Sequence, residues 1–159
     1  MAVKQGSQAI KARLGKALSA SLLPGDAPFS EQGLVEAVQF VVLAAARREA
    51  GEPVIEIASV AGSASERFLR IAVINDDMPF LVDSITMAIT AHGLEIDRLV
   101  HPVLPVRRDS EGQLTAIGDE QVADGTRESM IYLETRRGDA RLRRSEEHTS
   151  ELQSHLMIS

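Results

Sequence analysis

The chain has 159 residues, of which 44% are hydrophobic and only 3% aromatic, and its formal net charge is −6. This length and apolar share allow one ordinary domain with an aliphatic core. The acidic balance argues against nucleic-acid binding, and no apolar run approaches the roughly 20 residues of a membrane-spanning helix. The absence of cysteine excludes disulfides and thiolate metal sites and fits a cytoplasmic protein.

Residues 1–29 are predicted to form a helix and a linker. Ile10, Leu14, Leu18 and Leu22 recur every four residues, and the basic residues around them are accompanied by no acid before the linker. We expect a basic amphipathic helix that docks on the rest of the protein. A mitochondrial leader is the alternative interpretation of the same pattern.

Residues 30–66 are predicted to form a helix and a strand that lead into the next unit. Ser30 has the character of an N-cap, and Phe29 and Leu34 occupy the two positions of a hydrophobic staple. An apolar stripe at helical spacing follows. The alternation of apolar and polar residues over 53–60 predicts a strand.

Residues 67–143 carry the pattern of an α+β unit. The predicted elements are a strand over 67–75, a helix over 78–93, a strand over 94–109 that Pro102 and Pro105 interrupt or keep at an edge, and a strand over 128–135. The order β-α-β-β is that of an incomplete ferredoxin-like unit, which one further helix and strand would complete. We expect the missing elements to leave a sheet edge and a helix face uncovered, and the chain to be marginally stable or prone to aggregation.

The last segment, residues 144–159, does not continue the preceding pattern. Its first twelve residues, RSEEHTSELQSH, back-translate to a widely used sequencing-library adapter. We therefore predict that residues 144–159 are an artefactual, disordered tail on an N-terminal fragment of a longer protein. The histidines and glutamates of this tail are excluded from any metal-site argument.

The remaining residues carry no recognisable catalytic machinery. No G-x-G and no G-x-S-x-G occurs, and the three lysines all lie within the first sixteen residues. His92 and His101 stand on different elements without metal-ligand spacing, so a structural role is expected for each. The arginine pairs 47–48, 107–108 and 136–137 are expected to be solvated termini and turns. No catalytic, cofactor-binding or metal-binding residue is predicted.

Two adjacent aspartates are the most informative polar feature. In INDDMPFLVDSI, residues 74–85, Asp76 and Asp77 precede Pro79 and an apolar helix. Asp77 is expected to cap that helix, where a carboxylate meets free backbone N–H groups. Asp76 would then be available to the ammonium group of an amino acid. A metal site or a catalytic carboxylate pair remains an alternative, although adjacent side chains on an extended segment point apart and no calcium-loop pattern follows.

The stretch INDDMPFLVDSITMAITAHGLEIDRLVHPVLPVRRD, followed by ESMIYLE, resembles the N-terminal region of the large bacterial NAD-specific glutamate dehydrogenases. The stretch ARREAGEP, residues 46–53, is similar to what precedes that family's first ACT-like domain. This resemblance implies an α+β, ACT-like fold for residues 67–143. It also implies a parent enzyme that oxidatively deaminates L-glutamate with NAD, in a distal domain that nothing in residues 1–143 matches.

The resemblance further implies a regulatory or assembly role, because ACT-type modules commonly bind amino acids and pair through sheet edges or helices. The candidate ligand-binding residues are Asn75, Asp76, Asp77, Met78 and Pro79. The expected partners are an amino-acid effector and a second copy of the module, without nucleic acid or membrane, and the fragment itself is expected to bind no NAD. A free-standing amino-acid sensor and a pure oligomerisation scaffold are the alternatives.

Overall fold

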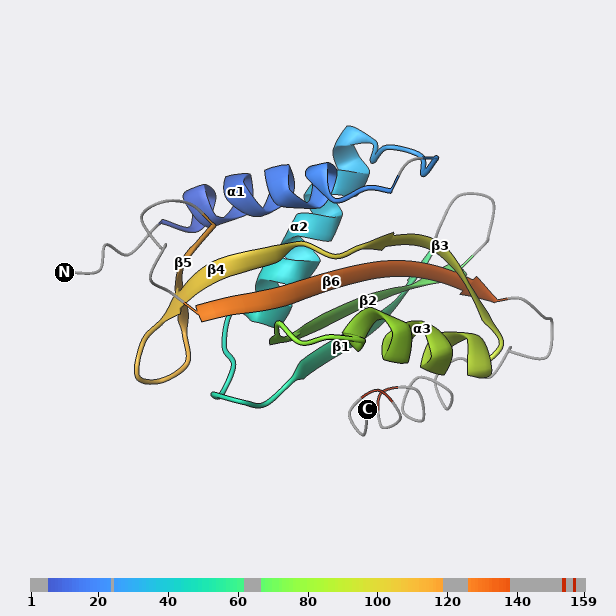
Figure 1. Ribbon diagram of the computed structural model, residues 1–159. Helices are drawn as coiled ribbons and strands as arrows, with labels where there is room; N and C mark the ends of the chain where they lie inside the picture. The colour runs from blue at the N-terminus through green and yellow to red at the C-terminus, as the bar shows by residue number, and fades with distance from the viewer. Residues whose placement is uncertain are drawn as a thin grey trace.

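The computed structural model describes residues 6–23, 25–61, 67–118 and 126–137, together with Gln153 and Leu156. Three helices and six strands follow one another within these residues (Figure 1). They are α1 (Ser7–Ala20), α2 (Glu31–Ala45), β1 (Val54–Ala61), β2 (Arg67–Asp76), α3 (Leu81–Ala91), β3 (Leu94–Val100), β4 (Val103–Arg108), β5 (Leu114–Ile117) and β6 (Thr126–Arg137).

All six strands belong to one antiparallel sheet with the order β1-β2-β6-β4-β5, and β3 also pairs with β6. The central strands β2 and β6 are paired from Leu69↔Thr135 to Asp76↔Glu128. Strands β3 and β4 lie along the same side of β6, on either side of a break at His101 and Pro102. The predicted interruption at Pro102 is therefore confirmed.

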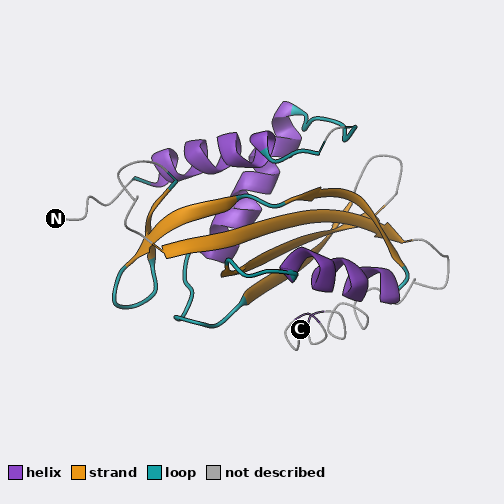
Figure 2. Cartoon of the chain, viewed as in Figure 1, coloured by secondary structure: helices purple, strands orange, loops and turns teal. Residues whose placement is uncertain are grey.

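Helices cover both faces of the sheet, so the fold has three layers (Figure 2). Helices α1 and α2 pack on one face, against Ala72 and Ile74 of β2 and Tyr132 of β6. Helix α3 packs on the other face, against Ile71 of β2 and Leu133 of β6. Because successive strand residues point to opposite faces, the nearly continuous apolar runs of β2 and β6 supply both cores. The mixed α+β, ACT-like fold predicted from the sequence is confirmed.

The two N-terminal helices form as the sequence predicts. The Ser30 side chain accepts a hydrogen bond from the Gly33 backbone N–H at 3.0 Å and so caps α2. Phe29 and Leu34 pack against the core from opposite sides of that cap. Helix α1 buries Ile10, Leu14 and Leu18, so the amphipathic stripe docks on the sheet layer as expected.

Strand β1 changes how the ferredoxin-like unit is built. It pairs antiparallel with β2 over its whole length, from Val54↔Ile74 to Ala61↔Arg67. A complete ferredoxin-like sheet also has an antiparallel strand beside its first strand, but there it comes last in the chain. The expected open edge beside β2 is therefore absent, because a preceding segment occupies it. The region before residue 67 and the region after it share one sheet.

The polar stretch after β4 holds a further strand that the sequence pattern did not predict. Strand β5 pairs with β4 across a tight turn, in which the Asp109 side chain accepts hydrogen bonds from the backbone N–H groups of Glu111 and Gln113 at 2.9 and 3.0 Å. Only four residues long, β5 falls below the length at which alternation gives a usable signal.

Helix α3 begins three residues later than predicted, and Asp77 does not cap it. The residue at the N-cap is Phe80, whose φ of 65° is left-handed and whose side chain makes no capping hydrogen bond. The Asp77 backbone N–H instead donates to the Arg127 carbonyl oxygen at 3.4 Å and extends the β2–β6 pairing. Pro79 disfavours a helical conformation only at Met78, the residue before it. The left-handed conformation of Phe80 is what prevents the helix from starting before Leu81.

Of the segment predicted to be an artefactual tail, the structure describes only Gln153 and Leu156. Both are helical, which differs from the expected disorder at these two positions. Leu156 is 6% exposed within the core cluster on the α3 side, and the Gln153 side-chain amide donates to the Ile55 carbonyl oxygen at 2.9 Å. An apolar face beside α3 attracts an apolar side chain whatever its origin. The adapter origin of the segment stays a prediction.

A cleft at the carboxyl end of α2 as the candidate functional site

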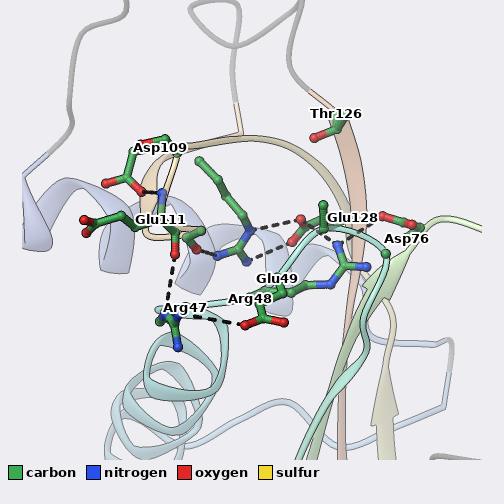
Figure 3. Close-up of a pocket in the computed structure, with 13 residues that line it drawn as sticks. Arg47, Arg48, Glu49, Asp76, Asp109, Glu111, Thr126 and Glu128 are labelled. Atoms are coloured by element: carbon green, nitrogen blue, oxygen red, sulfur yellow. Dashed lines mark hydrogen bonds and ion pairs between the residues drawn. The ribbon is translucent and has the colours of Figure 1, made fainter.

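The candidate site is a cleft of about 610 Å³ where the carboxyl end of α2 meets the β4–β5 turn and the facing ends of β2 and β6 (Figure 3). Its walls carry three guanidinium groups and five carboxylates. They belong to Arg47, Arg48 and Arg108, and to Glu49, Asp76, Asp109, Glu111 and Glu128. A cleft with both signs of charge suits a small polar ligand better than an apolar one.

A buried Arg–Glu–Arg group forms the floor of this cleft. Glu128 accepts hydrogen bonds from Arg48 Nη1 at 2.8 Å and from Arg108 Nε and Nη2, both at 3.0 Å. The side chains of Glu128 and Arg48 are each 3% exposed, and that of Arg108 is 12% exposed. Such a group is stable only because nearly every charge has a partner, since an unpaired ion at this depth costs several kcal/mol.

Arg48 connects four parts of the chain through its one side chain. Besides Glu128, it donates to the Glu52 carbonyl oxygen at 2.6 Å, to Asp76 Oδ1 at 3.0 Å and to Asn75 Oδ1 at 3.3 Å. The carboxyl end of α2 is thereby tied to the end of β2 and the start of β6. The planar, forked guanidinium makes this possible, and a lysine would not replace it.

Backbone hydrogen bonds also hold the carboxyl end of α2 against the β4–β5 turn. The Arg48 N–H donates to the Gly112 carbonyl oxygen at 3.0 Å, and the Leu114 N–H donates to the Ala46 carbonyl oxygen at 2.9 Å. Gly112 has a φ of +83°, and a Cβ atom there would lie 2.4 Å from the Arg48 carbonyl oxygen. Only glycine allows the β4–β5 turn to approach α2 so closely.

The structure separates the five predicted ligand-binding residues. Asp76 lies on the cleft wall with its side chain 52% exposed. Asn75 lies behind it and accepts from both Arg48 and the Asp76 backbone N–H. Asp77, Met78 and Pro79 do not line the cleft. Asp76 is not the unengaged carboxylate that the sequence suggested, since it already accepts from Arg48.

Two arginines contradict the prediction of solvated pairs. Arg48 is buried and Arg108 is half-buried, whereas Arg47 is exposed. A signal was available in the sequence: Arg48 continues the buried row of α2 after Ala45, and Arg108 is in phase with buried Val106. Glu128 is likewise in phase with Met130 and Tyr132 on β6. A charged residue at a position where the apolar repeat of a helix or strand would place a buried side chain therefore indicates a buried ion pair.

The two histidines have structural partners, as predicted. His92 Nδ1 lies 2.9 Å from the Ala88 carbonyl oxygen at the end of α3. His101 Nε2 lies 3.0 Å from Ser129 Oγ. Burial lowers the pKa of His101 from its ordinary value, and the Asp77 carboxylate offsets part of that shift.

A second group of paired charges lies between α2 and the sheet, where Arg70 of β2 also pairs with Glu36 of α2 at 3.3 Å. Glu134 accepts from Arg98 at 2.7 Å and from the Tyr132 hydroxyl at 2.6 Å, and Arg70 donates to that hydroxyl at 2.9 Å. Burial is the main cause that raises the pKa of Tyr132. Arg98 also stacks on the Phe29 ring at 4.3 Å and so fixes the linker after α1.

Within the described ranges, no group of three or more histidine, aspartate or glutamate side chains could hold a metal ion. In the same ranges, no helix is long and apolar enough to cross a membrane. The antiparallel sheet with helices on both faces is a mixed α+β, ACT-like fold.

The chain belongs to the family described as the ACT1 domain of glutamate dehydrogenase, whose model matches residues 25–153. The match ends inside the segment for which we predict an adapter origin. The chain is also 38% identical over 69 residues to the NAD-specific glutamate dehydrogenase of Halomonas elongata, a stretch that is 42% of this chain and 4% of that protein.

A second relative is the NAD-specific glutamate dehydrogenase of Pseudomonas aeruginosa, which is 41% identical over 66 residues. The match covers 40% of this chain and 4% of that protein. No solved structure matches the chain.

Proposed function

We propose that the chain is an N-terminal regulatory and assembly region of an NAD-dependent glutamate dehydrogenase. The parent enzyme would convert L-glutamate and NAD to 2-oxoglutarate, ammonia and NADH in the cytoplasm. The observation that carries this proposal is the ACT1-domain match over residues 25–153. The matched stretch is only 4% of each of the relatives named above.

The region itself is proposed to be non-catalytic and to bind no NAD. A dinucleotide site needs a glycine-rich turn that lets the pyrophosphate approach a helix N-terminus, and the sequence contains no G-x-G. The acidic and basic side chains of the cleft are engaged with one another rather than arranged around an acceptor for a proton or hydride. The purified chain should therefore produce no NADH from glutamate and NAD, and measurable turnover would contradict the assignment.

The regulatory part of the proposal places an amino-acid effector in the cleft. An α-amino acid presents an ammonium and a carboxylate, and the cleft offers both a half-exposed carboxylate, Asp76, and an exposed guanidinium, Arg47. Charge-assisted hydrogen bonds of this kind are stronger than neutral ones. The site is preorganised, because Arg48 holds Asp76 in place from below.

Effector binding can be tested by the thermal stability of the purified chain in the presence of each L-amino acid. A ligand that binds only the folded state at 100 times its dissociation constant adds about 2.7 kcal/mol and raises the melting temperature. Asp76→Asn should abolish the rise, and Asp77→Asn should keep it, because Asp77 does not line the cleft. A rise of the same size in both variants would place the effector elsewhere.

A pure oligomerisation scaffold is the second candidate, and one observation favours it. The contact between Arg48 and Asp76 gives the cleft carboxylate a structural use without any ligand. A scaffold would show no stabilisation by any amino acid while still forming oligomers. A free-standing amino-acid sensor would bind the same ligands, and the reading frame downstream of the Arg143 codon separates it from a long dehydrogenase.

A further inference from the structure

A groove between α1 and α2 lies apart from the charged cleft. The two helices cover the same face of the sheet (Figure 1), and the groove between them has a volume of about 510 Å³. The described residues that line the groove are all different from those that line the cleft. A volume of this size is typical of sites that bind small molecules.

The floor of the groove is apolar and closed. Val38 of α2 is only 6% exposed, and a Cβ atom at Gly15 of α1 would lie 3.4 Å from Val38 Cγ2. The two helices are therefore in contact at this point, and the groove narrows towards them. Val35 lines the groove with 49% of its surface exposed. Because removing an aliphatic side chain from water is favourable, an apolar group is expected to bind here.

The charged side chains of the groove all have the same sign. Lys11 and Lys16 line it, and the described lining residues include no acidic side chain. Neither lysine takes part in the hydrogen bonds and ion pairs of the described residues. The chain as a whole has a net charge of −6, and the lining of the cleft includes carboxylates as well as guanidinium groups. The groove is thus a local site for an anion on an acidic chain.

The two lysines can contact the same anion. They are five residues apart on α1, which corresponds to a rise of about 7.5 Å along the helix. A lysine stem is flexible and can lie along an apolar surface while its ammonium group stays in water. Lys16 is exposed and Lys11 is half-buried. Their ammonium groups can therefore meet at one carboxylate on the rim while an attached chain lies on the floor.

The shape of the groove suits an aliphatic chain better than a peptide helix. Its volume of about 510 Å³ equals that of about seventeen water molecules at about 30 Å³ each, which is enough for a carboxylate and a chain of about ten carbon atoms. An α-helix with its side chains is about 10 Å across, so it would rest on the rim without reaching the contact between Gly15 and Val38.

We propose that the α1–α2 groove binds a free aliphatic carboxylate of about ten carbon atoms, with its head group at Lys11 and Lys16 and its chain over Val35 and Val38. The chemical class is that of a medium-chain fatty acid. This site goes beyond the proposed function and shares no described residue with the cleft, so its failure would leave that function in place.

Isothermal titration of the purified chain with sodium decanoate tests the proposal. Saturable binding is expected, and each methylene added between hexanoate and decanoate should tighten it by up to about fourfold, the effect of burying one methylene. Decyltrimethylammonium has the same chain and the opposite charge, so it should bind at least about tenfold more weakly. No saturable binding of decanoate, or equal binding of the cationic amphiphile, would overturn the proposal.

Two pairs of variants separate the groove from the rest of the surface. Ala12→Phe fills the groove and should weaken decanoate binding at least about tenfold, whereas Ala9→Phe should not, because Ala9 is exposed on α1 outside the lining. Lys16→Gln should weaken binding at least about threefold, and Arg67→Gln at the start of β2 should not. All four positions are exposed, so the variants should keep the wild-type circular dichroism. Equal effects within either pair would refute the site.

The position of the head group can be tested through the lysines, because the chain has only Lys4, Lys11 and Lys16. Saturating decanoate should slow the reductive methylation of Lys11 and Lys16 at least about threefold, measured by mass spectrometry, because a bound carboxylate shields each ammonium group. Lys4 precedes α1 and should react at an unchanged rate. Equal slowing at all three lysines, or at none, would count against the proposed contacts.

Discussion

Replacing Glu128 by glutamine is the sharpest test of the buried Arg–Glu–Arg group. The substitution keeps the shape of the side chain and removes its charge. In the native protein this carboxylate accepts three hydrogen bonds from two guanidinium groups, at 2.8, 3.0 and 3.0 Å. The amide of glutamine has one oxygen to accept with, and its NH2 group faces donors. Arg108 then loses the carboxylate with which it pairs while its side chain is 12% exposed.

The expected cost follows from that geometry. Removing one partner of a buried ion pair typically costs 3–5 kcal/mol, and the surviving amide oxygen places Glu128→Gln near the lower limit, at about 3 kcal/mol. For a chain of this size that loss lowers the melting temperature by about 6–12 °C. Urea unfolding followed by circular dichroism measures the free energy directly.

Glu95→Gln is the matched control for this experiment. Glu95 also pairs with an arginine, but both side chains of that pair are more than half exposed, at 59% and 62%. Exposed pairs contribute little, so the control should change the free energy of unfolding by less than about 1 kcal/mol. If Glu128→Gln costs no more than the control, the group is not the structural element described above.

Two further predictions concern α3 and the break between β3 and β4. Phe80→Gly should raise the free energy of unfolding, measured by urea titration, by about 1 kcal/mol. Phe80 holds a left-handed φ of 65°, and with 76% of its surface exposed its side chain contributes little packing. An unchanged or lower free energy of unfolding would show that the left-handed conformation is not strained. Burial lowers the pKa of His101, so the unfolded state binds a proton more readily than the folded state does. The contribution of His101 to stability is therefore fully present above the ordinary histidine pKa. That contribution is lost as the pH falls from the ordinary pKa towards the lower pKa of the folded state. His101→Gln should flatten that part of the stability profile, and an unchanged slope in the variant would assign the dependence to another group.

The sequence predicts the elements whose signal is local and leaves the long-range pairing open. Ser30, with an apolar residue on either side of the first turn, identifies the start of α2 correctly. Pro102 marks the break between β3 and β4. In contrast, nothing in the segment 53–60 indicates that it pairs with β2, because strand partners depend on the whole sheet rather than on neighbouring residues.

The residues of the cleft show the same contrast between local sequence signals and long-range contacts. The motif at residues 74–79 correctly drew attention to Asp76, which lies on the cleft wall. Its partner Arg48 is 28 positions away in the sequence, and Glu128 is 80 positions from Arg48. Their proximity arises from the meeting of α2 with the ends of β2 and β6. The capping role predicted for Asp77 is wrong because the left-handed Phe80 sets the start of the helix and the pairing with β6 continues through residue 77.

The central claim is that the cleft of this ACT1 module binds an amino-acid effector of a glutamate dehydrogenase. Isothermal titration of the purified chain with individual L-amino acids, including glutamate and aspartate, tests it most directly. We predict saturable heat with at least one amino acid in the wild type and in Asp77→Asn. The heat should be lost in Asp76→Asn, whose amide oxygen can still accept the hydrogen bond from Arg48 and keep the protein folded. No heat with any amino acid, or equal binding by Asp76→Asn, would contradict the claim.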